Sequence, residues 1–146
     1  MPLRLRAEPL MRVLTYAGLV PFILATLALW WGEASAGFVL QSYSAIILSF
    51  LGGIHWGRAL GAQNIYAVPL LIGSNVMALA AWLTLLLNTP ILIYSILMAC
   101  FALHYQTDRA LAKLSILTPA FLRLRGHATL GVLVCLAAAL IHTFSQ

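Results

Sequence analysis

The chain has 146 residues, of which 63% are hydrophobic and 8% are charged, and its mean hydropathy is +1.01. A soluble domain carries about 25% charged residues, so this composition excludes a water-soluble globule, and long apolar runs without alternation favour membrane helices over a membrane barrel. The net charge of +5 does not indicate a nucleic-acid binder, because the basic residues separate hydrophobic segments instead of gathering on a soluble face.

Five apolar runs follow one another along the chain. A helix needs roughly 20 residues to cross a hydrocarbon core of about 30 Å. The runs cover residues 13–31, 38–60, 66–87, 91–105 and 126–144. The sequence therefore predicts an all-α integral membrane protein, a five-transmembrane-helix bundle that forms a single domain over residues 1–146. Pro21 should kink the first span, because its missing N–H frees a carbonyl of the preceding turn.

The connection between the fourth and fifth spans, residues 106–125, is the longest in the chain. Thr107 or Asp108 is placed to cap a short helix in which Leu recurs at every third position. We therefore predict a short amphipathic helix on the cytoplasmic face between helices 4 and 5 of the bundle. Thr118 followed by Pro119 predicts the start of the next helix, since Thr caps well and Pro fits the first helical position.

All eight Lys and Arg residues fall on one side of the five predicted spans, whereas the loops of the other side contain Glu33 and no basic residue. Cytoplasmic loops of membrane proteins carry the excess of Lys and Arg. We therefore expect a bacterial inner-membrane protein with a cytoplasmic N-terminus and a periplasmic C-terminus. Basic residues ahead of the first span mimic a signal peptide, but no small-residue cleavage site follows, which predicts a retained span.

The second span lies within QSYSAIILSFLGGIHWGRALG, residues 41–61, and has a small residue at every fourth position: Ala45, Ser49, Gly53, Gly57 and Gly61. Four residues advance a helix by about 400°, so these small residues stay near one face and let a second helix approach closely. The pattern predicts helix packing. It leaves open whether the packing partner is a helix of the same chain, a second copy or another membrane protein.

A second set of polar residues lies mostly off this ladder. His55 and Arg58 are three positions apart and are therefore neighbours on the helix surface. His104 is expected near the same membrane boundary, and the amide of Asn75 needs a partner at membrane depth. We predict a candidate ligand pocket formed by Ser44, His55, Trp56, Asn75 and His104. The alternative is that these residues are hydrogen-bonded packing residues, and that Arg58 is a snorkelling anchor.

Asp108 is the acidic residue expected on the basic side of the bundle, apart from Glu8. We predict an inner-rim ion pair between Arg58 and Asp108 that would join the second and fourth spans. The alternative role of Asp108 is to cap the short helix and to pair with a nearby Arg. Cys100 and Cys135 lie inside apolar runs, which is typical of packed free thiols.

The predicted spans contain no Asp, Glu or Lys, which proton and ion pumps usually need inside the membrane. The sequence also lacks a nucleophile–base pair, a phosphate-binding loop and a metal motif. We therefore expect neither an enzyme nor a metal site, and we assign no cofactor.

Two segments carry a resemblance to a known family: AIILSFLGGIHWGRAL at residues 45–60 and DRALAKLSILTPAFLRLRGHATLGVLVCL at residues 108–136. They resemble the bacterial and mitochondrial proteins of unknown function related to transmembrane protein 69. The resemblance extends roughly from residue 13 to the C-terminus. It implies a multi-span membrane protein and supplies no activity or cofactor. It gives weight to Gly52, Gly53, His55, Trp56, Asp108 and Arg123.

Two functions of different classes fit these features. The first, which we favour slightly, is a structural or accessory protein that packs through the second span against itself or a membrane complex. The second is a binder or carrier of a lipid, quinone or porphyrin. The expected partners are membrane lipid and that packing partner, and no nucleic acid. An exposed Gly53–Gly57–Gly61 face would favour the first function, and a pocket above roughly 300 Å³ lined by the predicted polar residues would favour the second.

Overall fold

The computed structural model describes residues 4–61 and 66–145, with side chains from Glu8 onward. Its helices are α1 (Arg4–Ala17), α2 (Val20–Trp30), α3 (Ala36–Gly61), α4 (Ala67–Thr84), α5 (Pro90–Lys113) and α6 (Pro119–Phe144). Five stretches are long and apolar enough to cross a membrane: Glu8–Trp30, which joins α1 and α2, and each of α3 to α6. The predicted all-helical, five-span fold is confirmed.

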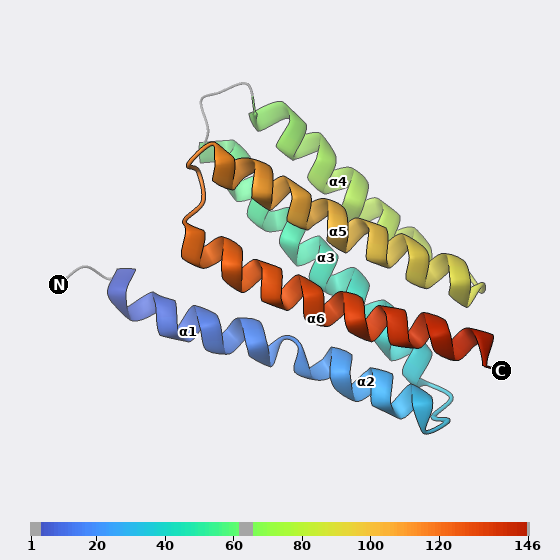
Figure 1. Ribbon diagram of the computed structural model, residues 1–146. Helices are drawn as coiled ribbons and strands as arrows, with labels where there is room; N and C mark the ends of the chain where they lie inside the picture. The colour runs from blue at the N-terminus through green and yellow to red at the C-terminus, as the bar shows by residue number, and fades with distance from the viewer. Residues whose placement is uncertain (1–3, 62–65, 146) are drawn as a thin grey trace.

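The helices form one elongated bundle (Figure 1). α1 and α2 run along one edge and α4 along the other, with α3, α5 and α6 between them. α1 begins at the end of the bundle opposite to the one where α6 ends. The six basic residues with described side chains lie in the half where α1, α4 and α6 begin: Arg12, Arg58, Arg109, Lys113, Arg123 and Arg125. We call this the basic end. The side chains of Arg4 and Arg6, also counted in the charge partition, lie outside the described residues.

The first span is broken between α1 and α2, as the position of Pro21 predicts. Pro21 has no N–H to donate to the carbonyl of Ala17, so the helix opens there. The next carbonyl, of Gly18, accepts a hydrogen bond of 3.0 Å from the Tyr43 hydroxyl of α3. The kink is therefore stabilised by a side chain from a neighbouring span, the usual way a freed backbone group is satisfied in a membrane.

α5 continues without a break to Lys113, so the prediction of a separate amphipathic helix after the fourth span is wrong. No Gly or Pro interrupts residues 105–113. Thr107 does not cap a helix but donates its hydroxyl to the Leu103 carbonyl one turn back, at 3.0 Å. Leu111 is buried at the basic end in a small apolar cluster with residues of α3 and α4 and with Leu117. Asp108 consequently lies inside the bundle.

The start of α6 matches its prediction. Pro119 occupies the first turn, and the Thr118 hydroxyl accepts a hydrogen bond of 3.3 Å from the Phe121 N–H. α6 therefore begins seven residues before the apolar run that marked it, and this carries Arg123 and Arg125 into the span.

α3 buries a different face from the one with the four-residue ladder. Ala45 is buried, but Ser49, Gly53, Gly57 and Gly61 are exposed, and a Cβ added to any of the three glycines would meet no atom within 4 Å. Packing of these glycines within the chain is therefore ruled out for the described residues. Each four-residue step turns about 40° beyond a full circle, so the ladder rotates away from the core.

Gly52, not Gly53, is the glycine of α3 at which the backbone of α4 comes close. A Cβ added to Gly52 would lie 3.2 Å from the Ser74 carbonyl oxygen of α4. The buried stripe of α3 includes Leu48, Gly52 and His55, a spacing of three and four residues that tracks one helix face. The backbone contact between α3 and α4 thus lies on the same face as His55.

Candidate functional site

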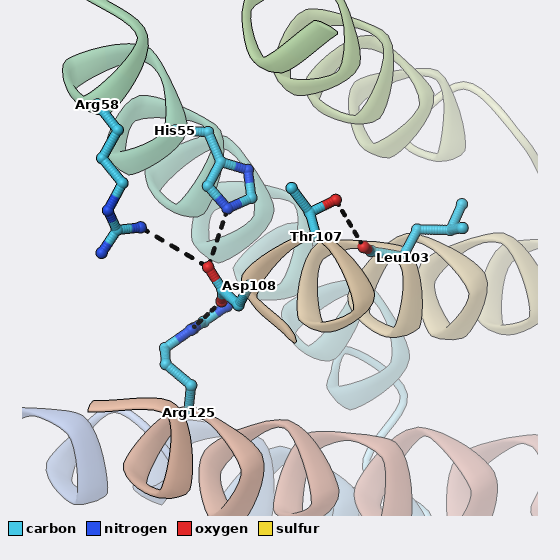
Figure 2. A network of polar contacts seen from close by, with 6 residues as sticks. All are labelled: His55, Arg58, Leu103, Thr107, Asp108 and Arg125. Carbon is cyan, nitrogen blue, oxygen red and sulfur yellow. Dashed lines mark hydrogen bonds and ion pairs between the residues drawn. The ribbon is translucent and has the colours of Figure 1, made fainter. Parts of the chain in front are cut away.

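Asp108 is the centre of a buried ionic cluster at the basic end. Its Oδ1 lies 3.1 Å from His55 Nε2 and 3.6 Å from Arg58 Nη1, and its Oδ2 accepts a hydrogen bond of 2.9 Å from Arg125 Nε. Figure 2 shows the three partners pointing to Asp108 from two sides, His55 and Arg58 from α3 and Arg125 from α6. The carboxylate therefore ties α5 to both neighbouring spans.

The cluster lies well inside the protein. The Asp108 side chain is 2% exposed and that of His55 is 4% exposed, whereas Arg125 is 12% and Arg58 is 23% exposed. A carboxylate withdrawn from water is stable only when charged or hydrogen-bonding partners replace its solvation. Because a carboxylate can only accept, His55 Nε2 is the donor in its contact with Asp108.

His104 stands beside this cluster without joining it. Its ring centroid lies 5.0 Å from that of His55, and the side chain is fully buried. Neither ring nitrogen has a hydrogen-bond partner among the described residues.

The Arg58 guanidinium lies 5.0 Å above the ring of Phe121, a cation–π contact that joins α3 to α6.

The structure separates the five residues of the predicted pocket. His55 and His104 are brought together as neighbouring rings. Ser44 is buried elsewhere on α3 and bonds its own helix at Leu40, while Trp56 is 42% exposed on the outer face. Asn75 is also exposed and donates back to the Leu71 carbonyl of its own helix. These five side chains do not line one cavity, because Trp56 and Asn75 point away from the bundle.

Arg58 and Asp108, paired in the sequence analysis, do lie in ion-pair distance, but the closer guanidinium on Asp108 belongs to Arg125. Sequence reasoning missed this partner, and the family resemblance gave weight to Arg123, which is exposed. Two residues along a helix turn by about 200°, so one of the two arginines had to face the bundle. The signal in the sequence was the small number of carboxylates at this end, which meant that several Arg residues would share Asp108 as a partner.

A cleft of about 490 Å³ opens beside the cluster, between the first span, α3 and α6. Its walls are apolar side chains such as Leu14, Phe50 and Val132, together with Phe22 and residues around the kink. Among the described lining residues, Arg125 is the one charged side chain. The cleft is within the size range of ligand pockets, about 300–1,000 Å³, and contains none of the five predicted pocket residues.

The cluster is not built to hold a metal ion. No group of three His, Cys, Asp or Glu side chains in residues 8–61 and 66–145 could coordinate one. The two guanidinium groups beside Asp108 would also repel a cation from the imidazoles.

Cys100 and Cys135 are buried free thiols, as expected from their apolar runs.

Comparisons with known proteins agree with the resemblance of the sequence segments. A family model described as a protein of unknown function (DUF3429) matches residues 7–141. Transmembrane protein 69 of Xenopus tropicalis is 36% identical over 138 residues, which cover 87% of this chain and 52% of that protein. The chain therefore spans about half the length of this curated relative. No solved structure gives a significant match. On these grounds the chain belongs to the DUF3429 family of proteins of unknown function, and it is a multi-span membrane protein related to transmembrane protein 69.

Proposed function

We propose that this membrane protein binds a small amphiphilic molecule in the cleft between the first span, α3 and α6. The observation that carries the proposal is the cleft itself, about 490 Å³ of apolar space that has one charged side chain, Arg125, among its described lining residues. Ligand sites combine a mostly apolar wall with a few polar groups that orient the ligand. This arrangement suits a molecule with an apolar body and one polar end.

A substitution that fills the cleft tests this function. Thr15 lines the cleft from α1, and its hydroxyl bonds only its own helix, at Met11. Thr15→Trp should displace a bound molecule, whereas Val13→Trp, at a 63% exposed position on the same helix, should not. Native mass spectrometry of protein released directly from membranes would report co-purified small molecules. Equal ligand retention in the two variants, or no ligand in the unmodified protein, would contradict the proposal.

A second candidate function is helix-mediated association with a second copy or a membrane complex. The observation that favours it is the exposed Gly53–Gly57–Gly61 face of α3, against which no described atom packs. Small residues allow two helix backbones in lipid to approach closely and gain dispersion contacts.

The stoichiometry seen by native mass spectrometry tests this second candidate. Gly57→Leu should abolish a dimer or complex, because the added side chain would hold the two backbones apart. Gly73→Leu is the matched control, since Gly73 on α4 also has no neighbour near an added Cβ. If both variants keep the assembly of the unmodified protein, the glycine face is not an interface.

We further propose that the basic end faces the cytoplasm or an equivalent inner compartment of a bacterial inner membrane. The support is the gathering of Arg and Lys at one end and of Glu33 at the other. With Cys100 and Cys135 replaced by Ala, Glu33→Cys should react with a membrane-impermeant maleimide in intact spheroplasts. Lys113→Cys should react only after permeabilisation. The reverse pattern would invert the orientation.

A further inference from the structure

The buried ionic cluster has more positive than negative charge. Arg58 and Arg125 both approach Asp108, and the whole chain contains only two other acidic residues, Glu8 and Glu33. Glu8 is exposed on α1, and Glu33 lies at the other end of the bundle. Neither can balance the second guanidinium inside the cluster. Counting Asp108 and the two guanidinium groups, the described cluster therefore has one unit of uncompensated positive charge.

The hydrogen bonds show the same imbalance. Arg58 Nη1 is a buried atom 3.6 Å from Oδ1, too far for a hydrogen bond, and it has no other partner among the described residues. Arg125 reaches Asp108 through Nε, which leaves its two terminal amino groups free to donate to another acceptor. A guanidinium in a mostly apolar surrounding is unfavourable when its donors lack an acceptor, and an anion is the acceptor that would also balance its charge.

The ionic cluster and the apolar cleft share one residue, Arg125. Arg125 is part of the cleft wall, and so is Phe121, whose ring the Arg58 guanidinium covers. Figure 2 shows Arg125 extending from α6 toward Asp108. A residue that contributes to the excess charge therefore also forms part of the cleft wall.

We propose that the ligand of this cleft is a single-chain amphiphile with an anionic head group, a carboxylate or a phosphate, and that Arg125 binds the head. This inference rests on the proposed function and names its ligand class. The anion would supply the negative charge that the cluster lacks, while the chain would fill the apolar cleft. A cationic head group would add a third positive charge, and a neutral one would leave the excess charge unpaired.

Four probes with the same C18 chain test the inference: oleate, oleyl phosphate, oleyl alcohol and oleylamine. Binding to the intact protein in detergent is measured by native mass spectrometry at matched probe concentrations. The two anionic probes should bind about tenfold or more tightly than the alcohol, as expected for a charge-assisted hydrogen bond, and the amine should bind least. A preference for oleate over oleyl phosphate, or the reverse, identifies the head group.

Variants then assign the head-group contact. Arg125→Gln should lower the affinity for the anionic probes to that for the alcohol, and residual alcohol binding shows that the variant is folded. Arg125→Lys should keep the preference for anions. Arg123→Gln, an exposed position two residues away, should change nothing.

The outcomes separate the two proposals. If all four probes bind equally and Thr15→Trp abolishes that binding, the cleft is a binding site but the anionic class is wrong. If an anion preference survives Arg125→Gln, Arg125 is not the head-group residue. If no probe binds the unmodified protein, the proposed function and this inference fail together.

Discussion

At the scale of single residues, Asp108 is the group on which the basic end depends. It touches side chains from α3 and α6 while sitting on α5, and the residues it joins are 53 and 17 positions away in sequence. Removing one partner of a buried ionic contact leaves the others uncompensated, and this is far more costly than the net value of the contact. Asp108 opposes two guanidinium groups at once.

Asp108→Asn is therefore expected to be severely destabilising. The amide keeps the shape of the side chain but removes the charge that Arg58 and Arg125 share, so the free energy of unfolding should fall by about 3–5 kcal/mol. Reversible unfolding in mixed detergent micelles measures this loss. Glu33→Gln, which removes an exposed carboxylate at the other end, should stay within about 0.5 kcal/mol of the unmodified protein. Similar stability of the two variants would show that the cluster contributes little.

At the scale of an element, α3 shows that a shift of one position along a helix is the difference between a packed glycine and an exposed one. Gly52 and Gly53 are adjacent, so their Cα–Hα bonds point about 100° apart around the helix. An added Cβ at Gly52 would press on the Ser74 carbonyl at 3.2 Å, and at Gly53 it would meet nothing within 4 Å. The sequence motif treats the two glycines alike, whereas the contact with α4 needs only one of them.

The paired substitutions Gly52→Ala and Gly53→Ala test this difference. Gly52→Ala should reduce the free energy of unfolding by about 1–3 kcal/mol, because a rigid backbone atom lies in the way of the methyl group. Gly53→Ala should be neutral or stabilising by up to about 1 kcal/mol, since Ala is the better helix former. The same micelle unfolding assay reports both. A larger loss for Gly53→Ala would mean that a partner covers its face in the assay.

Two helices end in the same way but with different residues. After α2, Gly32 has φ of 83°, and the N–H groups of Gly32 and Glu33 bond to the carbonyls of Leu29 and Ala28. After α5, Ser115 has φ of 59°. There the N–H groups of Ser115 and Ile116 bond back into the last turn of the helix, to Ala112 and Leu111. Both are Schellman caps, but Ser has a Cβ that the left-handed conformation disfavours.

Ser115→Gly should consequently stabilise the protein. Replacing Ser by Gly relieves a backbone strain of about 1 kcal/mol while keeping both cap hydrogen bonds. The midpoint of thermal unfolding should rise. Ser35→Gly, in the connection between α2 and α3, has no positive φ to relieve and serves as the control. A lower midpoint for Ser115→Gly would indicate that the Ser side chain has a role the backbone geometry does not reveal.

At the scale of the whole molecule, the sequence predicts the number of spans because a stretch of about 20 apolar residues is by itself enough to identify a membrane helix. The error at α5 has a physical cause. Asp108 within an otherwise helical segment suggested a surface helix, yet its charge is neutralised by side chains from other spans. A buried charge and an exposed charge look the same in sequence until the distant partner is known.

The candidate site was predicted only in part, again because the sequence does not show which distant residues meet. His55, Arg58, His104 and Asp108 were expected near one boundary, and the structure gathers them there. Arg125 was missed, since sequence cannot say which of two arginines on a helix faces inward. The cleft was missed as well, because its walls depend on the direction of α1 relative to α2 across the kink at Pro21, which no local pattern fixes.

The first span is the wall of the cleft that is least embedded in the bundle. In its 18-residue apolar stretch only 17% of the residues are buried inside the protein, whereas the corresponding share is 39% in α3 and in α6. Phe22 is its best-buried large side chain, 1% exposed, and its ring packs edge-on against Tyr43 of α3 and Phe101 of α5. One aromatic residue therefore supplies much of the contact that holds this span to the rest.

Phe22→Ala should loosen the first span without unfolding the bundle. Truncating a buried Phe removes about 3–5 kcal/mol of packing, and this span has few other buried side chains to compensate, so the loss should appear as local opening. Hydrogen–deuterium exchange in nanodiscs should quicken across residues 8–30 and stay unchanged across α5. Phe50→Ala, at a position on α3 that is 65% exposed, should alter neither region. If exchange in Phe22→Ala rises equally in every span, the first span unfolds together with the bundle and does not open locally.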